Sequence, residues 1–102
     1  PFARLRAPLG VVAVLGNHDY WGEGTAERLR RAFGGMGVTL LDNQVVARGP
    51  LVIGGIEDIY NGAPDLSATV STMKQRPGVR ILLSHSPDVF PALDPAVALT
   101  LV

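Results

Sequence analysis

The fold of this chain is decided by one short stretch of its sequence, VVAVLGNHD at residues 11–19. Residues 11–15 are apolar without alternation and rich in β-branched side chains, which is typical of a strand covered on both faces. Gly16 ends this apolar run, and three polar residues follow it directly. We therefore predict a central strand over residues 11–15 with a polar loop at its carboxyl end.

A second stretch, VRILLSHSPD at residues 79–88, is built in the same way. Residues 79–83 are predicted to form another buried strand, and it leads directly into a loop that contains His85. In open α/β sheets, ligands bind beyond the carboxyl ends of the strands. Both histidines of the chain, His18 and His85, lie in loops of this kind.

Helices are predicted where a capping residue precedes apolar side chains at spacings of three and four. Thr25 is predicted to cap the first helix and Asp65 the second, while Pro87 favours a short helix over residues 87–93. The apolar face of the first helix consists of Ala26, Leu29, Phe33 and Met36. Its arginines are expected to form a solvated face; they are Arg28, Arg30 and Arg31.

Turn residues divide the middle of the chain into three short predicted strands, at 38–41, 44–48 and 51–56. We expect these three strands to be antiparallel neighbours. A final strand is predicted over residues 97–102. Since strands and helices then follow one another along the chain, the fold class is α/β, a sheet layer that carries helices.

Composition excludes several classes of protein. With 102 residues, the chain has the size of one domain or a piece of one. Nine basic residues balance nine acidic ones, so no overall positive field favours nucleic acid as a partner. The absence of cysteine excludes disulfides, thiolate metal sites and cysteine nucleophiles. The longest apolar runs have about five residues against the 18 or more of a membrane span, so no transmembrane segment is predicted.

The two polar loops together resemble a known family. Gly16-Asn17-His18-Asp19 after one strand and LLSHSPD at residues 82–88 after another are similar to motifs of the calcineurin-like metallophosphoesterases. The pair Tyr20-Trp21 resembles the bacterial YkuE/YaeI-like branch of that family. The resemblance implies a four-layer α/β/β/α sandwich, of which residues 1–102 would be the middle portion, incomplete at both ends. In that fold, the strands at 11–15 and 79–83 would be parallel neighbours in one sheet, so that both histidine loops meet at a common edge.

The resemblance also implies a chemistry and a set of roles. It implies a phosphohydrolase that cleaves phosphate mono- or diesters by a metal-bound hydroxide at two divalent ions, with Mn, Fe or Zn as the metals. Asn17 and His85 would be ligands to one metal, and His18 would be a catalytic residue on the substrate side rather than a ligand. The family's other ligand motifs, Asp-x-His, Gly-Asp and Gly-His-x-His, do not occur in this sequence. We therefore expect the parent protein to be an enzyme and the isolated chain to be inactive and to self-associate.

Four further residues are candidates for the surroundings of the site. Asp19 either orients a neighbouring histidine or satisfies backbone amides. Tyr20 and Trp21 either form a wall of the substrate cleft or pack in the core. Asp58 follows the strand at 51–56, where it either shapes a substrate pocket or forms part of a polar turn.

Two other functions fit the same residues. The chain could be a non-catalytic protein-interaction scaffold that keeps the phosphoesterase fold without the chemistry. It could also be a one-metal binding module built from Asn17 and His85. A scaffold would not require Asn17, His18 and His85 together in strand-end loops, which favours the enzyme, with a phosphoester as its substrate.

Overall fold

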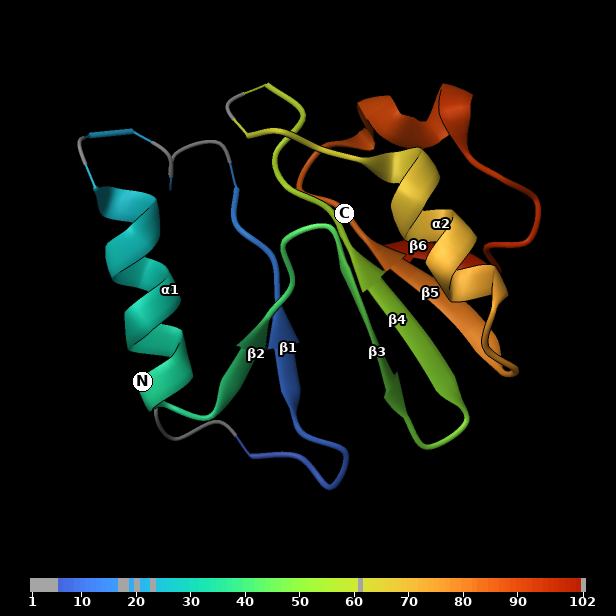
Figure 1. Cartoon of the computed structure of the whole chain (residues 1–102), viewed down its shortest axis with the longest axis horizontal. Helices are drawn as coiled ribbons and strands as arrows, with labels where there is room; N and C mark the ends of the chain where they lie inside the picture. The colour runs from blue at the N-terminus through green and yellow to red at the C-terminus, as the bar shows by residue number, and fades with distance from the viewer. Residues whose placement is uncertain (1–5, 17–18, 20, 23, 61, 102) are drawn as a thin grey trace.

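The computed structural model describes residues 6–16, 19, 21–22, 24–60 and 62–101 of the chain. Strands and helices follow one another along the sequence, with three consecutive strands between the two α-helices (Figure 1). They are β1 (Val11–Ala13), α1 (Thr25–Gly35), β2 (Val38–Leu40), β3 (Gln44–Arg48), β4 (Leu51–Gly55), α2 (Leu66–Lys74), β5 (Val79–Leu83), the 3₁₀ helix η3 (Pro87–Ala92) and β6 (Leu99–Leu101). The α/β class predicted from the sequence is confirmed.

The strands form two sheets. β1 and β2 pair in parallel as a sheet of two strands, and the other sheet has the order β3-β4-β5-β6. Within the second sheet, β4 is antiparallel to β3 and parallel to β5, which in turn is parallel to β6. The prediction that the strands at 11–15 and 79–83 are neighbours is therefore wrong, because β1 and β5 lie in different sheets.

The prediction that β2 is an antiparallel neighbour of the following strands is also wrong. The helix α1, which precedes β2, explains why. α1 carries the chain back to the starting end of β1, so that β2 runs in the same direction as β1, as in other strand–helix–strand units. Asn43, with a positive φ of 54°, then turns the chain out of this sheet. The hairpin predicted between 44–48 and 51–56 does form, as β3 and β4.

Two consecutive glycines show how the layers stack. A Cβ atom at Gly54 would lie 2.5 Å from Met73 Sδ of α2, whereas one at Gly55 would lie 2.7 Å from Val14 Cγ1. Successive residues of a strand face opposite sides of a sheet, so β4 packs against α2 on one side and against the smaller sheet on the other. With α1 on the outside of that sheet, the order is α/β/β/α, as predicted (Figure 1).

The main core lies between the larger sheet and α2. Its buried residues come from β4 and the residue after it, α2, β5 and η3, and they are Val52, Ile56, Met73, Leu82 and Val89. α1 contributes no buried residue, and its apolar face is only half-buried. No helix among the residues that the structure describes is long and apolar enough to cross a membrane.

Of the two predicted helix caps, one forms and the other does not. Asp65 caps α2 as predicted, because its Oδ1 accepts a hydrogen bond from the Ala68 amide at 3.1 Å. α1 instead begins after Gly24, which has a φ of 72° and makes no side-chain cap. Thr25 is the first residue of that helix, and its hydroxyl accepts from Arg28.

Candidate functional site

The two loops named in the sequence analysis meet at Gly16 and His85. A Cβ atom at Gly16 would lie only 2.7 Å from both Cε1 and Nδ1 of His85, so the glycine backbone packs directly against the imidazole. Gly16 follows β1 and His85 follows β5, which means that the contact joins the carboxyl ends of strands from the two different sheets. The loops therefore converge across the sheets rather than along one sheet edge.

The turn around His85 is fixed by two buried serines. Ser84 Oγ donates to the carbonyl of Ser86 at 2.9 Å and accepts from the Ser86 amide at 3.3 Å. Ser86 Oγ in turn accepts from the amide of Asp88 at 3.2 Å. Both hydroxyls are thus used to shape the turn, while the side chain of His85 is exposed to solvent.

Asp19 closes the first loop onto the strand that precedes it. Its Oδ2 accepts from the Gly16 amide at 2.7 Å, and its own amide donates to the Gly16 carbonyl at 3.1 Å. The Asp19 carboxylate thus satisfies a backbone amide of its own loop. Asn17, His18 and Tyr20 lie outside the described residues, so their predicted roles stay predictions.

Trp21 and Asp58 are the other predicted residues that can be placed. Trp21 is 56% exposed, so it does not pack in the core formed by the described residues. Asp58 is 2% exposed, and its Oδ2 accepts from the Tyr60 amide at 3.2 Å. Asp58 and His85 line the same pocket of about 200 Å³. The carboxylate and the imidazole therefore come from two segments that are far apart in sequence and meet at one place.

These groups do not by themselves complete a metal site. Within the described ranges, no group of three or more His, Asp or Glu side chains is arranged to hold a metal ion. An imidazole and carboxylates are suitable ligands for divalent metals, but a stable site needs more donors than His85 and Asp58 provide. A complete site would have to draw on ligands beyond this described set.

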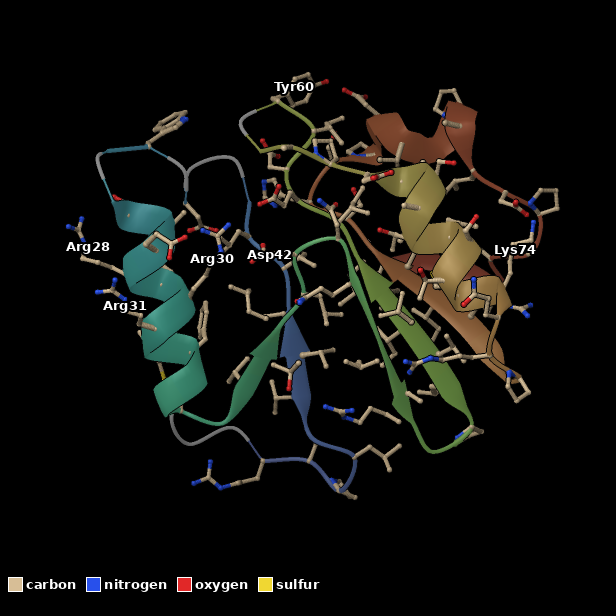
Figure 2. All side chains as sticks on the ribbon, in the orientation of Figure 1. Arg28, Arg30, Arg31, Asp42, Tyr60 and Lys74 are labelled. Atoms are coloured by element: carbon tan, nitrogen blue, oxygen red, sulfur yellow. The ribbon has the colours of Figure 1, made fainter. Side chains whose placement is uncertain are left out.

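Sequence analysis missed one polar cluster behind the site, centred on Arg30. The Arg30 guanidinium contacts Asp42 Oδ2 at 2.7 Å, Glu57 Oε1 at 3.1 Å and Glu27 Oε1 at 2.6 Å. Figure 2 shows Arg28 and Arg31 pointing away from the sheets, whereas Arg30 points toward Asp42. The prediction of a solvated arginine face is thus wrong for Arg30.

The Arg30 cluster joins α1 to the loop that carries Asp58. The hydrogen bond to Asp42, with the charge of that carboxylate, raises the pKa of Arg30 above its usual value. Glu57 also accepts from the Ala63 amide at 3.0 Å, and its own amide donates to Asn43. Only the pairing of Glu27 with Arg30 was visible in the sequence, as acid and base three residues apart on one helix.

The fold and the site together define an α/β sandwich in which the loops that carry Asp19, Asp58 and His85 follow the carboxyl ends of strands. Over most of its length, the chain is similar to two proteins of Bacillus subtilis (strain 168) called uncharacterized metallophosphoesterases. It is 31% identical to YkoQ over 91 residues, which is 84% of this chain and 33% of YkoQ. It is 33% identical to YkuE over 90 residues, which is 83% of this chain and 31% of YkuE.

The chain thus spans about a third of the length of these curated relatives. No family model matches the chain, and no solved structure matches it. The names of the two relatives support the metallophosphoesterase family that the histidine loops resemble.

Proposed function

We propose that the protein to which this chain belongs is a metal-dependent phosphoesterase that hydrolyses phosphate mono- or diesters. The observation that carries the proposal is the packing of Gly16 against the His85 imidazole. It joins two loops that are 69 positions apart, counted from residue 16 to residue 85. The two relatives named metallophosphoesterases support the same reaction class.

Each loop residue has a separate role in this proposal. Asn17 and His85 would hold one of two divalent cations, which could be Mn, Fe or Zn, since oxygen and nitrogen ligands suit all three. Such cations activate water and stabilise the charge that develops on the phosphoryl oxygens. His18 would give a proton to the leaving oxygen from its imidazole. Asp19 keeps its loop closed through the bond from the Gly16 amide.

Three single variants of the full-length gene product test this division of roles. His18→Ala should lower turnover of bis-(p-nitrophenyl) phosphate by roughly 10²- to 10⁴-fold, as expected for loss of a general acid. Its metal content should stay unchanged. Asn17→Ala and His85→Ala should lose bound metal, because each removes a ligand. Metal analysis of each purified variant, alongside the turnover assay, makes the comparison.

Two results would contradict the proposal. Equal loss of metal from all three variants would refute the separation of His18 from the ligands. A full-length protein that binds no divalent metal and hydrolyses no phosphoester would refute the enzyme and favour the interaction scaffold. Arg31→Ala, at an exposed position of α1, is the control variant. It should change neither the turnover nor the metal content.

A further inference from the structure

A small pocket lies between the loop after β4 and the loop after β5. It has a volume of about 200 Å³ and is lined by Asp58, Tyr60, His85, Ser86 and Pro87. Pockets that enclose a whole drug-sized ligand measure roughly 300 to 1,000 Å³. This pocket therefore has room for one part of a ligand whose remainder lies outside it.

The lining of the pocket combines exposed rings with buried polar residues. The rings belong to Tyr60, which is 67% exposed, and to the exposed Pro87. The buried polar residues are Asp58 and Ser86. An aromatic ring of this kind offers a large, rigid contact surface for another flat group.

The backbone of Tyr60 is held in place although its side chain is exposed. Its amide donates to Asp58 Oδ2 at 3.2 Å, and the Gly62 amide donates to the Asp58 carbonyl at 2.8 Å. Figure 2 shows Tyr60 on the loop after β4, at the same end of the molecule as η3. The backbone of Tyr60 is therefore tied to Asp58, at the point from which its ring extends.

Charge decides which part of a phosphoester fits here. A second anionic group beside the carboxylate of Asp58 would be repelled, whereas an uncharged ring would not. The pocket beside Asp58 therefore suits the organic substituent of the ester rather than its phosphoryl group.

We propose that this pocket is a subsite for a flat, uncharged organic group on the phosphorus of the substrate, and that Tyr60 determines specificity there. The proposal rests on the proposed phosphoesterase function and adds to it the class of substituent. The substrate class is an ester whose retained substituent carries an aromatic ring, rather than a small alkyl group.

Two substrates with the same leaving group test the subsite. In p-nitrophenyl phenylphosphonate and p-nitrophenyl methylphosphonate, water adds to phosphorus and the bond to p-nitrophenolate breaks, so only the retained substituent differs. In the full-length protein with Mn²⁺, Tyr60→Ala should lower kcat/KM for the phenyl substrate by roughly three- to tenfold, the effect of one lost aromatic contact. The value for the methyl substrate should stay within about twofold, in line with a position that makes no contact with it.

Two further variants separate stacking from other effects. Tyr60→Phe should keep the preference for the phenyl substrate, because the ring surface remains. Leu9→Ala removes an exposed apolar side chain near Gly49, at the opposite ends of the strands, and should leave both values unchanged. Equal losses on both substrates in Tyr60→Ala would overturn the subsite.

A binding measurement keeps the subsite testable apart from the reaction. By calorimetry, phenylphosphonate should bind more tightly than methylphosphonate, and Tyr60→Ala should abolish the difference. If neither ester is cleaved but this Tyr60-dependent preference is found, the proposed reaction fails while the subsite stands. If the two phosphonates bind equally to the unsubstituted protein, the subsite is refuted whatever the activity.

Discussion

At the scale of single residues, Gly16 has the most demanding position. Its φ lies outside the left-handed region, so the backbone there would accept any residue, and the need for glycine comes from the neighbouring imidazole. Any side chain would meet the ring of His85 at a distance that real Cβ atoms do not adopt. Glycine thus allows the loop after β1 to lie directly against the histidine after β5.

Gly16→Ala should therefore move the His85 ring more than it harms the fold. His85 is exposed and can swing toward solvent, so the free energy of unfolding should fall by only about 1 kcal/mol, the low end of overpacking costs. The carbon-bound proton resonances of His85 should shift in NMR spectra. These are easily assigned because the chain has only two histidines.

The matched control for Gly16→Ala is Gly34→Ala in α1. An added Cβ at Gly34 meets nothing within 4 Å, and alanine should raise the free energy of unfolding by about 0.5 to 1 kcal/mol through its helix propensity. The His85 resonances should not move in this control. An unchanged His85 spectrum in Gly16→Ala would show that the ring does not depend on the glycine.

At the scale of elements, local sequence signals predicted structure that depends on local interactions. The β3–β4 hairpin and the Asp65 cap are confirmed. The partner of β2 was not predictable from residues 38–41 alone, since an apolar strand can pair in either direction. Its direction is set by α1, which returns the chain beside β1.

The residues of the candidate site also divide into those with a local sequence signal and those that only the fold brings together. His85 and Asp58 were found because polar residues that end apolar strands are conspicuous in a sequence. Arg30 was missed because two of its partners, Asp42 and Glu57, lie in other segments and only the fold brings them to α1. Since α1 buries no residue, we expect this ion cluster to contribute to the attachment of the helix to the sheets.

Arg30→Met should consequently loosen α1. The substitution keeps most of the stem volume but leaves the part-buried carboxylates of Asp42 and Glu57 without their cation. We expect the free energy of unfolding to fall by about 1 to 3 kcal/mol, the cost of leaving such groups unpaired. Urea unfolding followed by circular dichroism measures it. Arg31→Met, at an exposed position of the same helix, should change stability by less than about 0.5 kcal/mol.

A second readout ties the Arg30 cluster to the pocket. Because Glu57 precedes Asp58 in the chain, amide hydrogen exchange in the loop after β4 should speed up in Arg30→Met. Unchanged exchange in that loop, together with unchanged stability, would show that α1 is held by apolar contacts alone.

At the scale of the whole molecule, the two sheets differ in width. The smaller sheet has two strands and packs over β4, where Gly55 meets Val14 and Leu41. Laterally paired residues of parallel strands share a face, and Gly55 pairs with Leu83, which pairs with Leu101. The inner face therefore continues beyond the smaller sheet onto β5 and β6.

This continuation of the inner face is apolar and open. Leu99 is 50% exposed and Leu101 is 49% exposed, and β6 is the last strand of its sheet among the described strands. An exposed, apolar edge strand is a template for pairing with another chain. A net charge of zero provides no repulsion between copies to oppose such pairing.

The 102-residue chain alone should accordingly associate with itself through the β6 face, and one charge there should prevent it. The charge introduced by Leu101→Lys would lose its hydration in the contact. This variant should therefore weaken association by at least about tenfold, which corresponds to the loss of one buried leucine. Sedimentation velocity over a range of concentrations measures the effect. Leu9→Lys, at a leucine of equal exposure away from β6, should leave association unchanged. A chain that sediments as a monomer at every concentration would contradict this prediction, and equal weakening by both variants would place the contact elsewhere.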